Sequence, residues 1–553
     1  MMQQAANSLK PPRFKRNRMA GQGRQNANEA TTFRGVIGLF NRFLAAQMIL
    51  AAFAWVAWAS CSGGACSSVT IDTWNISLSA GTLAIAIYFA YRLLRQDSAM
   101  VLTPAFGFAV NVVMFSALGP LIYTLGPEDV VSYMAVHPTA ITFTEVIRAH
   151  LLNAVGAAAA VSGAILALMF FTGKARKMKV VGVPRRIIPV PVVAAAFLIF
   201  GLALKYGLII PARFGTLDIV VPGAIENLVF LPDLGFAALG LLAARGREYA
   251  KIILCCVWPI HLGLTFLEFG KLSFLTALML PAIGAYISTG NIRRLAVWAL
   301  LGAAAFYISQ PIFGSARDAI QTMNAEETIE RATYSQRVEY LGAALAGEVA
   351  VADVYADSRT HPWLRLNYVP YQVHSMRMYD GGTGGDTLNE VWMYFVPRLV
   401  WPEKPVIVPL GRRWYSDFLG REVYATSVGI TIYGDGYWQA GWPGVITFSF
   451  LTGFAFGLIT ILSYRAIKHG DFATVPAVFF ALQLSFLGTS GFFQTTIIGG
   501  LIFYAAYQLL IRVIKSIYFP GPRPVPARRS KGAVHHWSAR RDGEGALQER
   551  AVD

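Results

Sequence analysis

Residues 147–171 read IRAHLLNAVGAAAAVSGAILALMFF, an apolar run in which Arg148 is the only Lys, Arg, Asp or Glu. A helix rises about 1.5 Å per residue, so this run can cross a hydrocarbon core of about 30 Å. Eleven comparable runs lie elsewhere in the chain. We therefore predict an all-α, polytopic integral membrane protein of about twelve transmembrane helices with one long periplasmic loop. The helices are expected at residues 36–59, 76–95, 101–124, 147–171, 187–208, 217–244, 252–268, 272–290, 294–314, 440–463, 472–490 and 492–514.

The composition excludes an ordinary soluble protein. Of 553 residues, 55% are hydrophobic and 14% are charged, whereas soluble proteins average about 25% charged residues. A net charge of +16 in a soluble chain would suggest nucleic acid. Here much of the positive charge lies in the two tails and in short loops, where it sets topology, so we expect no nucleic-acid partner.

Lys and Arg accumulate on alternate loops, which predicts the orientation. The N-terminal tail is basic, whereas the loops at 60–75 and 125–146 contain neither residue. Basic clusters in loops predicted to lie on the same side of the membrane as the N-terminus are found at 92–95, 174–186, 245–251, 293–294 and 465–468. Because such clusters mark cytoplasmic loops, both termini are predicted to be cytoplasmic, with disordered basic tails at 1–35 and 515–553.

A long segment at 315–438 separates helices 1–9 (residues 36–314) from helices 10–12 (residues 439–514). It contains 11 Lys or Arg and 15 Asp or Glu, unlike the basic cytoplasmic loops, and is predicted to be a large periplasmic loop. A helix is expected at 325–350, starting at a capping box formed by Asn324 and Glu327. On the outer loop 60–75, Cys61 and Cys66 either form a disulfide or remain free thiols.

The chain carries no motif for nucleotide, zinc or serine-hydrolase chemistry, and no D-x-D pair for a metal-bound nucleotide sugar. We therefore expect no cofactor and no metal, so any phosphate must be bound by Arg and Lys. Cations placed near the predicted outer ends of helices either snorkel to head groups or bind an anionic substrate. They are Arg148, Lys205, Arg213, Lys271 and Arg317. Charged residues inside predicted helices, which are costly in lipid, are second-rank site candidates: Glu226, Asp233 and His261.

The densest group of polar and aromatic residues lies at the end of the long segment. It consists of NEVWMYFVPRLVWPEKP (389–405), GRRWYSDF (411–418) and TSVGITIYGDGYWQAGWPGVI (426–446). Aromatic rings stack on sugars, carboxylates accept hydroxyl protons, and arginines neutralise a departing diphosphate. The same composition also fits an amphipathic loop at the membrane interface. Composition alone does not separate these two interpretations.

The P-R-x-x-W-P-x-K-P string at 397–405, preceded by Asn-Glu and followed by Thr-Ser, resembles bacterial O-antigen and exopolysaccharide repeat-unit polymerases. The resemblance covers residues 389–457. It implies a metal-independent glycosyltransferase of the bacterial inner membrane that polymerises undecaprenyl-diphosphate-linked oligosaccharides at the periplasmic face. Membrane lipids, a flippase and a chain-length regulator are the implied partners. In this family Glu is more usual at the position of Asp435, which leaves the role of Asp435 open.

The resemblance implies roles for individual residues. Asp435 or Glu390 would deprotonate the acceptor hydroxyl, and Arg398 would stabilise the leaving diphosphate. Further substrate-binding residues are expected to be Lys404, Arg412, Arg413, Arg317, Trp401, Trp438 and Arg148. Two alternatives remain open. An O-antigen ligase would perform the same chemistry on another acceptor, and a polysaccharide transporter or flippase would show inverted repeats with broken helices.

Reporter fusions test the predicted topology. Alkaline phosphatase is active only outside the cytoplasm, so a fusion after Asp357 should be active and a fusion after Lys179 should be inactive. Activity is measured in intact cells, with fusion protein levels compared on blots. The reverse pattern would place the 315–438 segment in the cytoplasm and remove the basis for a periplasmic site.

Overall fold

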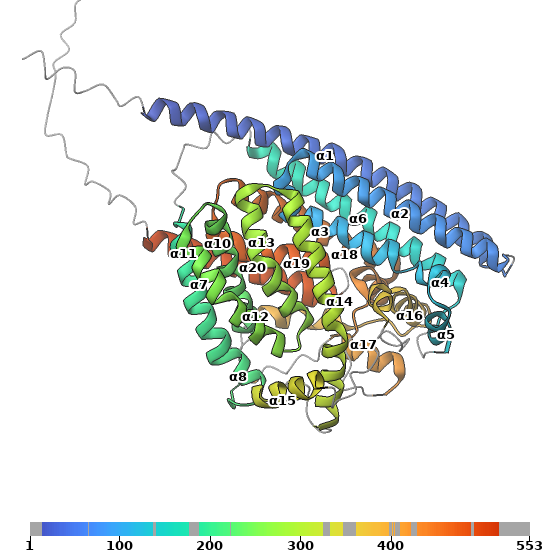
Figure 1. The fold of residues 1–553 in the computed structure, drawn as a ribbon. Coiled ribbons are helices and arrows are strands. Elements are labelled where there is room, and N and C mark those ends of the chain that lie inside the picture. The colour runs from blue at the N-terminus through green and yellow to red at the C-terminus, as the bar shows by residue number, and fades with distance from the viewer. Residues whose placement is uncertain are drawn as a thin grey trace, which may run out of the picture.

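The structure is a computed structural model that describes residues 14–64, 66–136, 140–175, 187–219, 221, 223–323, 332–346, 361–396, 401, 403, 410–421, 428–487 and 491–518. All regular elements in these ranges are helices (Figure 1). Within them, nine helices are long and apolar enough to span a membrane, which confirms an all-α polytopic membrane protein. They are Glu29–Cys61, Ser68–Gln96, Phe143–Thr172, Val190–Arg213, Glu248–Leu267, Lys271–Thr289, Ile292–Ser309, Thr431–Lys468 and Thr496–Tyr518.

Three of the twelve predicted ranges contain shorter apolar helices: Pro104–Leu118, Leu228–Ala244 and Val475–Leu487. At about 1.5 Å per residue, none of the three reaches the about 30 Å of a hydrocarbon core. The count of twelve membrane spans therefore remains a prediction.

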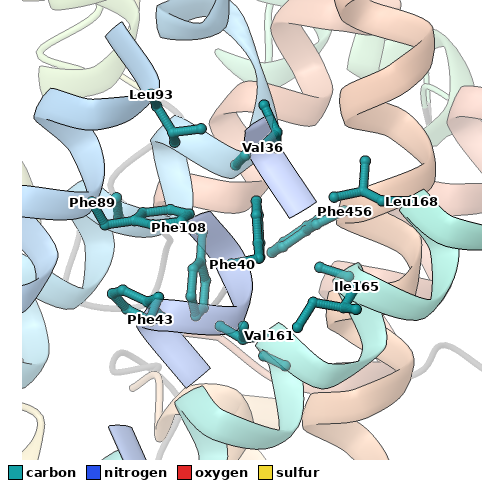
Figure 2. Close-up of a cluster of buried hydrophobic side chains, with 14 of the residues drawn as sticks. Val36, Phe40, Phe43, Phe89, Leu93, Phe108, Val161, Ile165, Leu168 and Phe456 are labelled. Carbon is teal, nitrogen blue, oxygen red and sulfur yellow. The ribbon is translucent and has the colours of Figure 1, made fainter. Parts of the chain in front are cut away.

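The first group of helices packs around one apolar core. Its members are α1 (Phe14–Cys61), α2 (Ser68–Gln96), α3 (Pro104–Asn111), α6 (Phe143–Ala175) and α18 (Thr431–Lys468). Figure 2 shows Phe40 and Phe43 of α1 meeting Phe89 of α2 and Phe108 of α3 in this core. The short helices α4 (Ile122–Leu125), α5 (Glu128–Val136) and α16 (Val369–Asp380) cover one end of the group (Figure 1).

Helices α6 and α18 approach one another to backbone contact. A Cβ added to Gly453 would lie 1.7 Å from the carbonyl oxygen of Ala160, and one on Gly163 would lie 2.0 Å from that of Phe450. Gly457, four residues after Gly453, meets Ala164 of α6 in the same way. Glycines spaced by four residues form one helix face, and small residues there allow close packing in a membrane. The two helices can approach this closely only because residues 163, 453 and 457 are glycines, which have no side chain.

The second group of helices surrounds a separate core. Its long members are α7 (Val190–Leu204), α10 (Leu231–Ala244), α11 (Glu248–Cys256), α12 (Trp258–Leu267), α13 (Lys271–Thr289) and α14 (Ile292–Met323). Further elements of this group are α8 (Ile210–Arg213), α9 (Gly223–Glu226) and α15 (Tyr334–Leu345). Helices α19 (Val475–Leu487) and α20 (Gly499–Tyr518) join the two groups, because Ala481 and Tyr507 pack into the core of the second group.

The two ends of the first group carry different contacts. At one end, ion pairs join Glu29 to Arg465 and Asp97 to Lys468. At the other end lie α16 and the disulfide between Cys61 and Cys66, the bonded form of the two alternatives left open by the sequence. The part of α1 around Glu29 thus lies beside the end of α18, on the same side of the bundle as the end of α2. The alternation of basic loops predicts that these segments share one side of the membrane. That this side faces the cytoplasm remains a prediction.

Several predicted boundaries need correction. Helix α1 begins at Phe14, inside the tail predicted to be disordered, because residues added to an existing helix avoid the unfavourable nucleation step. Helix α14 continues to Met323, past the predicted start of the long segment at residue 315. Within the predicted helix 325–350, the described helix begins at Tyr334, where Thr333 and Gln336 form the capping box. The predicted cap at Asn324 and Glu327 lies outside the described residues.

The contact between α6 and α18 predicts the effect of one methyl group. Gly453→Ala should lower stability by about 1–3 kcal/mol, because the added Cβ overlaps the backbone of α6. The matched control is Gly263→Ala on α12, where no heavy atom lies within 4 Å of the added Cβ. We expect a lower Tm for purified Gly453→Ala protein in detergent and an unchanged or higher Tm for Gly263→Ala. Equal Tm values for both variants would contradict the close approach.

Candidate functional site

The candidate site is built on a break in helix α18. Ala440 and Gly441 have non-helical backbone angles, and Gly441 has the positive φ of 62° that glycine tolerates. Eight residues of continuous helix span about 12 Å. Yet a Cβ on Gly444 would lie 2.0 Å from the carbonyl oxygen of Gly436. The segment Thr431–Gln439 therefore folds back on the rest of α18 as a separate half-helix.

Asp435 lies in the middle of this half-helix and is fully buried. Its Oδ2 accepts a hydrogen bond of 2.9 Å from the backbone N–H of Phe493. Its Oδ1 has one longer contact of 3.5 Å, from the side-chain amide of Gln439. One oxygen of the carboxylate is thus held in place while the other is only weakly bound.

Neutral polar side chains surround Asp435 from three parts of the chain. The buried hydroxyl of Thr387 accepts hydrogen bonds from the amides of Gln439, at 2.5 Å, and Gln494, at 2.9 Å. Thr387 begins the 3₁₀ segment Thr387–Phe395, whereas Gln494 lies in the π-helical turn Phe493–Ile498. The site is therefore assembled from the long segment, from the half-helix at the start of α18 and from the last predicted membrane helix at 492–514.

A glycine loop covers the half-helix. The N–H of Gly385 donates a hydrogen bond of 2.9 Å to the carbonyl oxygen of Trp438. A Cβ on Gly385 would lie 2.7 Å from the amide of Gln439 and 2.8 Å from the ring of Trp438. The backbone can approach this closely only because residue 385 has no side chain. The part of the long segment near Gly385 thus lies directly over the half-helix.

Arg413 joins the loop to helix α17 (Leu410–Leu419). It pairs with Asp386 at 2.6 Å and with Glu390 at 2.8 Å. Although burial alone would lower the pKa of Arg413, the hydrogen bond to Glu390 and the charge of Asp386 raise it. Arg413 therefore stays charged, and both predicted site residues, Arg413 and Glu390, are already committed to one another.

Helix α16 is fixed to α6 by crossed ion pairs. Arg148 of α6 pairs with Asp380 at 2.7 Å, while Glu145 pairs with Arg377 at 2.6 Å. The hydroxyl of Tyr437 donates to Asp380 at 3.0 Å and accepts from Arg148 at 2.9 Å. Arg148, predicted to bind substrate, is thus part of the contact that holds α16 beside the half-helix.

Among the described residues, five indole, guanidinium and amide atoms on the half-helix, on α17 or at Gln494 are buried without a hydrogen-bond partner. They are Trp414 Nε1, Trp438 Nε1, Arg412 Nε, Gln439 Oε1 and Gln494 Oε1. Trp414 and Trp438 belong to the same core cluster, together with Phe492. Buried polar groups are usually paired, so a concentration of such atoms marks a place where a polar ligand can bind. Trp438 lies on the same half-helix as Asp435, and Arg412 lies on α17, whose Leu410 and Trp414 pack in the same cluster as Trp438.

The other predicted site residues are placed less fully. Trp401 stacks on Trp392, with ring centroids 5.6 Å apart. Arg317 lies on the last turns of α14. Arg398 and Lys404 lie outside the described residues.

Sequence reasoning missed Thr387, Gln439 and Gln494. Gln494 stands near the start of a predicted membrane helix, where a polar side chain is unusual and could have been noticed. Thr387 and Gln439 are common residue types in ordinary surroundings, and no signal in the sequence distinguishes them.

The chain matches no protein-family model, no curated protein and no solved structure. The arrangement of residues around Asp435 is therefore the basis for the function discussed below.

The break in α18 predicts different outcomes for two neighbouring glycines. A Cβ on Gly436 would lie 2.7 Å from the carbonyl oxygen of Gly444, whereas one on Gly434 would find its nearest atom at an ordinary 3.5 Å. Gly436→Ala should therefore lower the Tm of the purified protein, and Gly434→Ala should leave it nearly unchanged. If Gly436→Ala matched the wild type, the half-helix would not fold back as described.

Proposed function

We propose that this chain polymerises undecaprenyl-diphosphate-linked oligosaccharide repeat units into O-antigen or exopolysaccharide at the periplasmic face of the bacterial inner membrane. The observation that carries the proposal is the buried carboxylate of Asp435 on a broken helix covered by the Gly385 loop, together with nearby buried donors that have no partner among the described residues. The sequence around it, residues 389–457, is also the part that resembles repeat-unit polymerases. In this proposal both termini are cytoplasmic, and a flippase and a chain-length regulator act in the same pathway.

The proposed reaction is one glycosyl transfer. The hydroxyl oxygen of the acceptor sugar forms a bond to the anomeric carbon of the donor, and the bond from that carbon to the diphosphate oxygen breaks. The bonding electrons leave with undecaprenyl diphosphate, and the hydroxyl proton passes to Asp435. Oδ1 is the suitable oxygen, because Oδ2 already accepts the Phe493 N–H while Oδ1 has only the 3.5 Å contact with Gln439.

Asp435 is a better candidate for the base than Glu390. Glu390 Oε1 already accepts a hydrogen bond of 2.8 Å from Arg413, so this carboxylate is engaged in holding the loop. Arg413 and Glu390 instead hold α17 against the loop. Arg412, whose Nε lacks a partner among the described residues, is proposed to bind the leaving diphosphate together with Arg398 and Lys404.

Polar side chains in the site fit a sugar substrate. The indole N–H groups of Trp414 and Trp438 can donate to sugar hydroxyls, and the free amide oxygens of Gln439 and Gln494 can accept from them. Trp401 and Trp392, which stack outside this buried region, are proposed to contact the glycan further along the chain.

A transporter or flippase is the second candidate function. Discontinuous helices and buried charges near the middle of the membrane are typical of transporters. Besides α18, the chain has a π-helical turn at Lys205–Ile209 and an interruption between α11 and α12. An O-antigen ligase would use the same chemistry with lipid A core as the acceptor.

Deletion of the gene in its host, followed by complementation, tests the proposal. Asp435→Asn should keep an acceptor for the Phe493 N–H but cannot take a proton, so long polymer should fall by at least about 100-fold. Single repeat units should remain on the surface glycolipid. Surface glycans are resolved by gel electrophoresis, and protein levels are measured on blots.

The matched control is Glu248→Gln, an exposed carboxylate on α11 that pairs with Lys251, and it should restore normal polymer. Normal polymer in Asp435→Asn would exclude Asp435 as the base. A deletion strain that lacks all surface glycan would contradict the polymerase proposal. If such a strain accumulated lipid-linked polymer, the protein would be a ligase. If it accumulated no lipid-linked polymer, the protein would be a flippase.

A further inference from the structure

The second group of helices contains buried charges that the proposed reaction does not use. Lys205 Nζ lies 2.9 Å from Glu268 Oε1, and His261 Nε2 lies 2.7 Å from Asp233 Oδ1. All four side chains are at most 4% exposed. Removing so many charges from water is unfavourable, and a buried ion pair adds little stability compared with an apolar pair. The retention of this cluster therefore suggests a function other than stability.

Hydrogen bonds connect the two pairs into one chain. The hydroxyl of Tyr206 lies 2.9 Å from His261 Nδ1 and 3.4 Å from Thr265 Oγ1. Lys205 Nζ in turn donates to Thr265 Oγ1 at 3.5 Å. The chain thus runs from Asp233 on α10, through His261, Tyr206 and Thr265, to the Lys205–Glu268 pair at the end of α12. His261, Tyr206, Thr265 and Lys205 each carry a proton that can exchange.

The backbone is irregular where the cluster lies. Lys205 and Tyr206 begin the π-helical turn Lys205–Ile209, an element often found at functional sites. His261 stands one turn after the interruption between α11 and α12, and Asp233 is in the first turn of α10. Interrupted helices next to buried charges are how membrane proteins form internal ion sites.

Asp233 is the carboxylate of the cluster that pairs with His261, while Glu268 pairs with Lys205. A second buried cation, Arg337 of α15, donates to the carbonyl oxygens of Leu267 and Glu268 at 3.3 and 3.0 Å. Asp233 Oδ2 is fully buried and has no hydrogen-bond partner among the described residues. The residues that the structure describes contain no group of three His, Cys, Asp or Glu side chains that could hold a metal ion. A proton needs no coordination shell, so it fits this environment better than a metal ion does.

We propose that the Asp233–His261 pair, linked through Tyr206 and Thr265 to Lys205 and Glu268, is an exchangeable proton-binding site. Neutral His261 donates its Nε2 proton to Asp233 and accepts from Tyr206 at Nδ1. When Nδ1 gains a proton, the Tyr206 hydroxyl rotates and donates its hydrogen bond to Thr265 Oγ1. The only new covalent bond is the N–H bond at Nδ1. The pair then consists of imidazolium and carboxylate.

The groups that face this site come from every neighbouring element. Lys205 and Tyr206 face it from α7 and its π-turn, and His261 and Glu268 face it from α12. From α15, Tyr334 and Arg337 lie near Glu268. Helices α13 and α19 contribute apolar side chains such as Leu280 and Ala481 to the core around α10. Tyr206 is only partly buried, so it is the route by which the site exchanges protons with the surroundings.

Infrared difference spectroscopy tests the proposal with the full-length protein in nanodiscs. Histidine is isotope-labelled, and spectra at pH 8 and pH 5 are compared in potassium chloride. The wild type should show an imidazole signal that is absent from His261→Gln. In Asp233→Asn the signal should be lost between pH 8 and pH 5, because the carboxylate that stabilises the imidazolium is gone.

The matched control is Glu226→Gln, which breaks the exposed Arg213–Glu226 pair in the same group of helices and should leave the signal unchanged. Tyr206→Phe removes one hydroxyl without changing charge and should slow proton exchange if the charge variants fail to fold. A wild-type spectrum with no His261 signal would overturn the proposal. A signal that follows sodium concentration and not pH would also overturn it, in favour of a sodium site. Neither result depends on glycan polymerisation.

Discussion

The backbone contact between α6 and α18 is the constraint on which the rest of the structure depends. Gly163, Gly453 and Gly457 bring the two helices together so closely that carbonyl oxygens occupy the space where side chains would lie. Lipid provides no hydrophobic force between helices, so close van der Waals contact must hold them. Because α18 is fixed in this way, the half-helix at its start has a rigid base and α16 has a defined surface on which to dock.

The half-helix turns this packing into a site. A continuous α18 would carry Asp435 along the membrane axis, whereas the break at Gly441 folds it back beneath the long segment. The crossed ion pairs between α6 and α16 and the Arg413 contacts close the region from two sides. Several buried polar atoms here have no partner among the residues that the structure describes, which is unfavourable for stability and supports the proposal of a polar ligand.

Two kinds of buried polar group thus occupy separate parts of the molecule. Around Asp435 the neighbours are mostly neutral amides, hydroxyls and indoles, which suit an uncharged, hydroxyl-rich substrate. Around Asp233 the neighbours are charged and hydrogen-bonded in a chain, which suits an ion. The irregular helices at both places are consistent with this division, because regular apolar helices alone offer no polar surface within a membrane.

The sequence by itself determined the membrane class, since a run such as 147–171 is long and apolar whatever its surroundings. The sequence also identified Asp435 as a candidate site residue. It did not predict that α1 begins at Phe14, because extension of a helix depends on the neighbouring span. Only the tertiary structure paired Glu390 with Arg413 and brought Gln494 next to Thr387, 107 residues away. Hydrophobic runs are local properties of a chain, whereas these pairings depend on the angles and distances at which helices pack.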